Sequence, residues 1–289
     1  MTLLNQISIE ALGTHWWIEL LEQPESELLR QQLLQTIHDF EQAYSRFLPN
    51  SLITQLNDTG VLVNPPRELV QLLEYGLSTY QLSGGAFDIS IGSQLEEQGY
   101  GRQSHNIIGK HLPLDQALTI SQQQISLSGA RIDLGGFGKG WLIDKLAELC
   151  QEHGVADYLI NGGGDIRVGN QPVAIAIEHP GDPSLYIGEI PLQYEALASS
   201  SPAKRRWNDG AKQRSHIQGR ADNVMNENIA SAHVLAPTAT VADTLATLCF
   251  LMDTEPFAKI AQQLDAAYLC VCTDGTYQVS GRLQFSANR

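Results

Sequence analysis

The most restrictive segment of this sequence is RIDLGGFGKG (131–140), in which an apolar strand pattern runs through four glycines into a helix. Glycine lets a backbone turn sharply and approach another group closely. The N–H groups of such a turn and the N-terminus of the following helix form a natural phosphate site. The segment is not a P-loop, because neither Ser nor Thr follows Lys139 and no glycine stands five residues before Gly138. Purely structural glycines explain the turn equally well.

A second glycine turn, NGGGD (161–165), joins two predicted strands. It does not fit the GxGxxG fingerprint, because Arg167 occupies the position of the last glycine. Asp133 and Asp165 lie beside these two turns, where a carboxylate would repel an anionic ligand. We therefore predict that both carboxylates brace the turns by accepting backbone N–H hydrogen bonds.

Asp243 and Thr247 form a second candidate feature, in the helix predicted over 238–252. Thr238 or Thr240 can cap this helix through a hydroxyl. Residues four apart project from one helix face, so the carboxylate and the hydroxyl lie close together. Oxygen pairs of this kind suit Mg²⁺ bound to phosphate. The alternative is an Asp favoured by the helix dipole and a Thr hydrogen-bonded to a backbone carbonyl.

The periodicity of apolar residues predicts a mixture of helices and strands without βαβ regularity, and hence the α+β class. We expect one domain over residues 1–289, and loops in the polar stretches 201–215 and 222–228. Trp16, Trp17 and Tyr44 are expected in the core. Predicted helices span 25–45, 65–83, 139–153, 238–252 and 255–265; predicted strands span 14–21, 157–161, 166–168, 172–178, 187–191, 267–273 and 276–285.

The net charge of −14 over 289 residues argues against nucleic-acid binding, which requires basic patches. No apolar stretch approaches the roughly 18 residues of a membrane span, so no stable membrane insertion is expected. We expect a cytoplasmic protein, or a periplasmic or lipid-anchored one if a leader preceded this sequence. The four cysteines lie in apolar patterns, which favours buried free thiols over a disulfide or zinc site.

Several longer blocks occur in an order that resembles the FAD:protein FMN transferase (ApbE) family. DLGGFGKGWLID (133–144) matches the central DLGGxxKGxxxD motif, and NGGGDIR (161–167) follows it. The other blocks are LGTHWW (12–17), YSRFLPNSLITQLN (44–57), GGAFDISIG (84–92), SHI (215–217) and APTATVADTLAT (236–247). Together they cover about residues 11–285.

The resemblance implies an ApbE-like (T-fold-related) α+β architecture with antiparallel-rich sheets, packed helices and an FAD cleft between two lobes. It also implies an enzyme that uses Mg²⁺ to transfer the FMN moiety of FAD onto a Thr or Ser hydroxyl of a target flavoprotein, releasing AMP.

Site residues follow from the resemblance by matching positions. The metal ligands would be the backbone carbonyl of Gly138 and the side chains of Asp243 and Thr247. Lys139 matches a lysine of the central motif. Phe47 falls where the family places an aromatic residue against the isoalloxazine ring. The other flavin or nucleotide contacts would be Leu12, Ala86, Phe87, Asp88, Gly135, Trp141 and Gln218.

His216 is the candidate general base, because an imidazole titrates near neutrality and a hydroxyl nucleophile must lose its proton. A histidine that only hydrogen-bonds phosphate is the alternative. Asp88 either holds the edge of the flavin ring or caps the turn that follows it.

Two segments depart from the family pattern. The SHI block lacks the aspartate–proline turn that usually follows it, and ASSSPA (198–203) stands where the family reads ATSGxY. Because both segments border the family's cleft, two other functions remain open. The protein would then be an FAD pyrophosphatase that releases FMN and AMP, or a non-enzymatic FAD-binding or storage protein.

Overall fold

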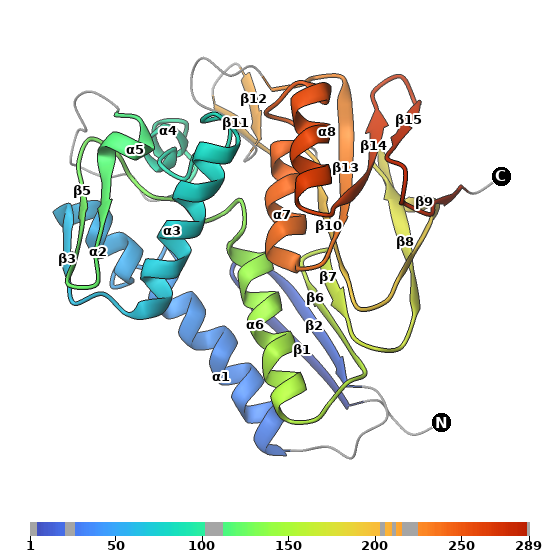
Figure 1. Ribbon diagram of the computed structural model, residues 1–289, viewed down its shortest axis with the longest axis horizontal. Coiled ribbons are helices and arrows are strands. Elements are labelled where there is room, and N and C mark those ends of the chain that lie inside the picture. The colour runs from blue at the N-terminus through green and yellow to red at the C-terminus, as the bar shows by residue number, and fades with distance from the viewer. Residues whose placement is uncertain are drawn as a thin grey trace. The chain divides into compact units, whose positions relative to one another are not determined.

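The computed structural model describes residues 5–20, 27–101, 112–202, 206–209, 212–215 and 225–287. They form two compact units, and the boundary first falls within helix α1 (Glu27–Tyr44). The first unit draws its residues from 1–38, 137–204 and 226–289, and the second from 39–136 and 205–225. Figure 1 labels the elements of both units. Among the described residues, no helix is both long and apolar enough to span a membrane.

An antiparallel sheet dominates the first unit, with eight strands among the described residues. Its order is β1-β2-β6-β7-β10-β13-β14-β15. The bounds of the strands are β1 Asn5–Ala11, β2 Thr14–Leu20, β6 Tyr158–Gly162, β7 Asp165–Val168, β10 Ala196–Ser200, β13 Ile229–Ala236, β14 Ala267–Cys272 and β15 Tyr277–Val279.

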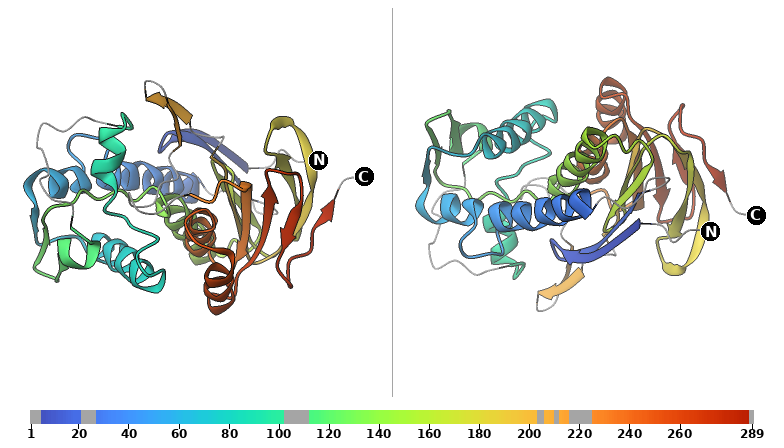
Figure 2. Two further views of the ribbon diagram at one scale, coloured as in Figure 1. Left: turned by 90° about the horizontal axis from the view of Figure 1, so that it is seen from above. Right: turned by 90° about the horizontal axis from the view of Figure 1, so that it is seen from below.

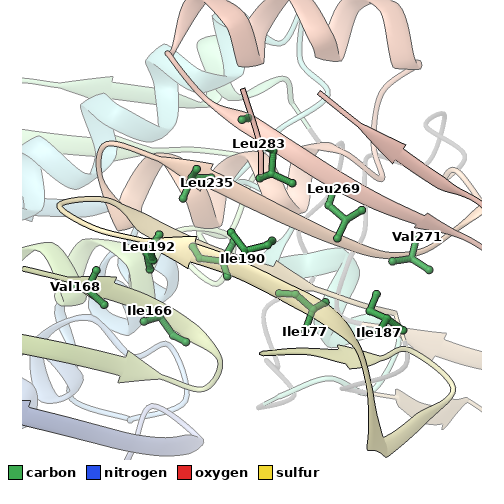
Figure 3. Packing of buried hydrophobic residues seen from close by; sticks show 12 residues of the cluster. Ile166, Val168, Ile177, Ile187, Ile190, Leu192, Leu235, Leu269, Val271 and Leu283 are labelled. Carbon is green, nitrogen blue, oxygen red and sulfur yellow. The ribbon is translucent and has the colours of Figure 1, made fainter. Parts of the chain in front are cut away.

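A smaller sheet in the order β16-β9-β8 belongs to the same unit; its strands are β8 Val173–His179, β9 Asp182–Leu192 and β16 Ser286–Ala287. Apolar residues at a spacing of two point from each sheet into one shared core. Leu269 and Val271 of β14 pack in this core with Ile190 and Leu192 of β9 (Figure 3). The core thus joins strands that are some 80 residues apart in the sequence.

Helices cover the other face of the large sheet. Helix α6 (Gly138–Glu152) packs against β6 and β7, α7 (Ala239–Leu248) against β10 and β13, and α8 (Thr254–Gln263) against β14. Figures 1 and 2 show these helices beside the strands named. Because side chains alternate along a strand, Cys270 points to this helical layer while Leu269 and Val271 point to the core.

The second unit is mainly helical. Its buried apolar side chains include Ile53 and Leu56 of α2 and Leu69 and Leu72 of α3, together with others from 86–95 and 114–134. A sheet of order β3-β5-β4 and a hairpin of β11 and β12 complete it. The bounds are α2 Leu52–Thr59, β3 Val61–Val63, α3 Arg67–Leu82, α4 Gly92–Glu97, α5 Leu114–Ala117, β4 Leu118–Ile120, β5 Gln124–Leu127, β11 Arg206–Asp209 and β12 Lys212–Ser215.

The α+β class is confirmed, and most predicted elements lie within a few residues of their expected bounds. Three expectations are wrong. The stretch 201–215, predicted as a loop, contains the hairpin of β11 and β12. The predicted strand 276–285 is paired only over Tyr277–Val279 in β15. Trp17 is 41% exposed, because it alternates with the buried Trp16 along β2.

Candidate active site

The N-terminus of α6 lies directly against the N-terminus of α7. A Cβ atom added at Gly140 would stand 2.3 Å from the carbonyl oxygen of Ala239, so only glycine permits this approach. The backbone N–H of Gly140 donates to Asp243 Oδ2 at 3.1 Å. The central glycine turn of the sequence therefore places the start of α6 on the candidate metal ligand.

Asp144 completes the contact between the two helices. Its carboxylate accepts hydrogen bonds from the backbone N–H groups of Ala239 and Thr240, each at 2.8 Å, and from the Thr240 hydroxyl at 2.6 Å. It also pairs with Arg167 of β7. The Thr238 hydroxyl accepts from the N–H of Val241 at 3.3 Å, which confirms the predicted N-cap. Asp144 thus holds α7 by satisfying N–H groups that a helix start leaves unpaired.

Asp165, Lys139 and Asp243 form a buried cluster, called here the Lys139 cluster. The Lys139 ammonium pairs with Asp165 and lies 3.3 Å from Asp243 Oδ2. Asp165 also accepts the backbone N–H of Ser199 at 3.1 Å. The two aspartates are 2% and 3% exposed, so they leave little room for solvent screening. With both carboxylates ionised, the three side chains carry one net negative charge.

The electrostatic consequence falls on Asp243. Burial raises the pKa of this carboxyl to about 7, against the opposing effect of Lys139 and with a further contribution from the negative Asp165. A cation placed at Asp243 would relieve this unfavourable charge. Lys139 would keep Asp165 as a partner if Asp243 bound such a cation.

The predicted metal ligands fit Mg²⁺ by the chemistry of their donor atoms. Thr247 is half-buried one helical turn after Asp243, and Gly138 is the buried first residue of α6. The donors are a carboxylate, a hydroxyl and a backbone carbonyl, all hard oxygens. Among the described residues, no group of three or more His, Cys, Asp or Glu could hold a metal. Of the three predicted ligands, only Asp243 is a residue of one of those four types.

Phe47, the expected flavin-stacking residue, lies in the second unit and is 49% exposed. Its ring meets the edge of the Tyr100 ring at 5.7 Å, and the Arg46 guanidinium carbon lies 4.5 Å from its centroid. Arg46 is itself buried, pairs with Asp133 and lies 3.8 Å from Glu96. Phe47 therefore presents an aromatic face supported by a fixed guanidinium.

Four other expected contacts belong to the second unit. Ala86, Phe87 and Asp88 are all buried. Asp88 Oδ1 accepts the N–H and the hydroxyl of Ser90 at 2.8 and 2.6 Å, so this oxygen caps the turn as one alternative predicted. The N–H of Gly135 donates to Asp133 at 2.6 Å, which confirms that Asp133 braces its turn. Asp165 was also expected to accept an N–H of its own turn, but it accepts the N–H of Ser199 in the neighbouring strand β10.

Leu12 and Trp141 belong to the first unit. Leu12 has φ of 53° in the two-residue turn between β1 and β2, a conformation unusual for a leucine. Trp141 is half-buried on α6, with its ring 6.5 Å from that of Phe137. Their flavin contacts remain predictions. His216 and Gln218 lie outside the described residues. The role of His216 as general base therefore stays a prediction.

The structure also brings together a group that the sequence patterns did not single out. His233, buried in β13, has Nδ1 2.9 Å from the Ser199 hydroxyl and Nε2 3.0 Å from the Ser231 hydroxyl. Through the Ser199 backbone this group is joined to Asp165. In the sequence, the only sign of this group was that Ser231 and His233 are two residues apart and so share one strand face. Ser199, the third member, lies 34 residues before His233.

Several known proteins are similar to this chain over most of its length. The FAD:protein FMN transferase of Haemophilus influenzae is 24% identical, over 96% of this chain and 89% of that protein. The Vibrio cholerae protein of the same name is 24% identical, over 89% and 84% of the two chains.

Solved structures show the same fold. The ApbE protein of Thermotoga maritima aligns with a TM-score of 0.83 and 23% identity, over 96% of this chain and 97% of that chain. The Vibrio cholerae flavin transferase ApbE aligns with a TM-score of 0.77 and 21% identity, over the same shares. Residues 12–270 match the sequence profile of the ApbE family. The chain therefore belongs to the ApbE family.

Proposed function

We propose that this protein is an FAD:protein FMN transferase, which moves the FMN moiety of FAD onto a Thr or Ser hydroxyl of a target flavoprotein and releases AMP in a Mg²⁺-dependent reaction. Flavin transfer is supported by family membership and by the enzyme name that the curated relatives share. The metal, the acceptor hydroxyl and the product are our proposal.

The observation that carries the metal requirement is the net negative Lys139 cluster, with Thr247 one turn further along α7. Asp243 and Thr247 would hold Mg²⁺ with the carbonyl of Gly138. When bound, Mg²⁺ supplies neutralisation of the pyrophosphate charge and of the charge that develops on the leaving AMP phosphate.

The chain's own residues have separate tasks. Asp144 fixes the start of α7 and so orients Asp243 and Thr247. Asp165 holds the Lys139 ammonium in place, so this cation is oriented before any phosphate arrives. The N-terminus of α6 adds a positive dipole end that favours a phosphate nearby. Phe47 offers its exposed ring to the isoalloxazine.

His216 is proposed to take the proton of the acceptor hydroxyl, which then attacks the phosphorus nearest the flavin. General-base assistance contributes about 10²–10⁴-fold. His216→Ala should therefore slow transfer by about that factor while the affinity for FAD changes little. If His216 only contacts phosphate, FAD affinity and transfer rate would fall together.

The proposal is tested by incubating the protein with FAD, Mg²⁺ and a flavoprotein that carries a target threonine. The flavin transferase of Vibrio cholerae serves as a positive control for the acceptor. In-gel flavin fluorescence on the acceptor supports the proposal. Release of free FMN without labelling would identify an FAD pyrophosphatase instead, and unchanged FAD at every metal concentration would identify a binding or storage protein.

A further inference from the structure

Cys249 and Cys270 meet in the helical layer of the first unit, and neither residue is assigned a part in flavin transfer. Cys249 directly follows the last residue of α7, and Cys270 lies in the middle of β14. Both side chains are buried, at 3% and 2% exposure. Their sulfur atoms are 3.0 Å apart.

This separation is close to bonding distance. A disulfide has an S–S length of about 2.05 Å, so the two sulfurs need to approach by roughly a further 1 Å. Small rotations of two cysteine side chains supply such a movement. Backbone hydrogen bonds hold both partners, since the Cys249 N–H donates to Leu245 at 2.9 Å and Cys270 is paired with Ala232 and Gln278.

We propose that Cys249 and Cys270 form an intramolecular disulfide when the protein meets a disulfide oxidant. The sequence favoured free thiols for these residues, because all four cysteines lie in apolar patterns and Cys270 and Cys272 do not form a CxxC pair. Cys249 and Cys270 lie 21 positions apart. Only the tertiary fold brings them together.

The reaction balances with a low-molecular-weight disulfide as the oxidant. One cysteine of the pair, as thiolate, attacks the oxidant to give a mixed disulfide and one small thiol. The second cysteine then attacks the protein sulfur of that mixed disulfide and releases the second small thiol. The two cysteines lose two electrons and two protons, and the oxidant is reduced to two thiols.

The bond would fasten the C-terminal end of α7 to the sheet and close a loop that contains α8. Cross-linking a loop of this length restricts the unfolded chain. For a chain of this size we expect the melting temperature to rise by roughly 5–10 °C on oxidation. The disulfide would also oppose local opening of α7, the helix that carries Asp243 and Thr247.

The test uses the full chain treated with oxidised glutathione, both as folded protein and during refolding from denaturant, because the buried sulfurs are slow to react in the folded state. We expect the number of free thiols to fall from four to two, with the rise in melting temperature reversed by a reductant. Trypsin places Cys249 in the peptide 221–259 and Cys270 in the peptide 260–282, so the linked pair is identified by mass.

Matched variants separate this bond from other thiol reactions. Cys272→Ser leaves a single cysteine in the peptide 260–282 and should retain the cross-link, as should Cys150→Ser in α6. Cys249→Ser and Cys270→Ser should each abolish it and the shift in melting temperature. The wild-type peptide map decides the matter even if a variant fails to fold. Four unreacted thiols, a link through Cys272, or glutathione adducts alone would overturn the proposal.

Discussion

The two units each bury a group of charged side chains, and the two groups differ in balance. In the second unit, Arg46 and Arg131 meet the largely buried Asp133 and Glu96, so two positive charges face two negative ones below the surface. Arg131 also pairs with Asp58, whose carboxylate is 40% exposed and therefore solvated. In this Arg46 cluster each guanidinium has a carboxylate partner and also donates to a backbone carbonyl, that of Tyr100 for Arg46 and that of Asn57 for Arg131. In the first unit, the Lys139 cluster sets one ammonium against two carboxylates.

The difference separates a supporting group from a binding group. A balanced set of buried charges is stable without a ligand provided that each partner remains. A set that lacks a positive charge gains when a cation binds, and in its absence the carboxylate tends to take up a proton. The Arg46 cluster accordingly supports the exposed Phe47, whereas the Lys139 cluster is suited to metal-bound phosphate.

The largest expected effect is on stability, from Asp133→Asn. This change removes the nearer of the two carboxylates paired with the buried Arg46 guanidinium and leaves only Glu96, 3.8 Å away. Because breaking a buried pair costs about 3–5 kcal/mol, we expect the free energy of unfolding to fall by about 3 kcal/mol. Urea denaturation measures this value. Glu255→Gln, which breaks the exposed pair of Glu255 with Lys259, serves as the control and should have no measurable effect. Equal stability of Asp133→Asn and wild type would remove the distinction between the clusters.

In contrast to Asp133→Asn, Asp243→Asn should lower the transfer activity and leave the stability unchanged or higher. The amide can still accept the Gly140 N–H, and Lys139 keeps Asp165, so the metal-free protein should be as stable as wild type or more stable. Transfer activity should fall by at least about 100-fold, because even residues that only orient metal ligands contribute 10–100-fold. A Mg²⁺ titration of activity and a melting curve in a chelator measure both. Full activity combined with a loss of stability would reverse our assignment.

The pH dependence sharpens the same contrast. Because the folded pKa of Asp243 is raised from its usual value of 3.8 to about 7, the folded metal-free protein binds a proton that the unfolded chain does not between these values. Its contribution to the free energy of unfolding is therefore largest near pH 4 and is lost as the pH rises to about 7. Melting curves of wild type and Asp243→Asn in a chelator, from pH 4 to 8, should diverge accordingly. A constant difference across this range would show that the pKa is not raised.

Below pH 7 the proton also competes with Mg²⁺ for Asp243, so the apparent affinity for Mg²⁺ should fall about tenfold per pH unit. Calorimetric titration with Mg²⁺ at several pH values measures this slope.

Phe47→Ala should give the smallest change. Aromatic stacking is worth about 0.5–1.5 kcal/mol beyond burial, so affinity for FAD should fall by roughly tenfold. The melting temperature should hardly move, since half of the Phe47 side chain is already exposed. Phe47→Tyr is the matched control and should retain affinity. A lower melting temperature with unchanged FAD affinity would make Phe47 a structural residue.

Much of the fold was accessible from local patterns. The helices around Leu142 and Leu245 have apolar residues at helical spacing, and Asp274–Gly275 marks the turn between β14 and β15. The hairpin of β11 and β12 was not accessible in this way, because seven of its eight strand residues are polar and apolar residues do not alternate along it. Trp17 was expected in the core together with Trp16, but adjacent residues of a strand face opposite sides of the sheet, so Trp17 of β2 is exposed where Trp16 is buried.

For the site, the sequence indicated which groups matter but not how they are connected. The spacing of Asp243 and Thr247 and the glycines before α6 were visible as motifs. The pairing of Lys139 with Asp165, 26 residues away, and the capping of α7 by Asp144 depend on tertiary contacts. No local periodicity records such contacts.

The capping of α7 by Asp144 has a consequence for the order of folding. The hydrogen bonds from Ala239 and Thr240 reach a residue 95 and 96 positions earlier in the chain. Contacts of such long sequence separation form late, because a large loop must close first. A nascent chain that has just made residues 239–248 holds both candidate ligand side chains, but not the anchored helix that presents them. We expect metal capture to report on completed folding, and a chain stalled before this contact forms to bind no Mg²⁺ at all.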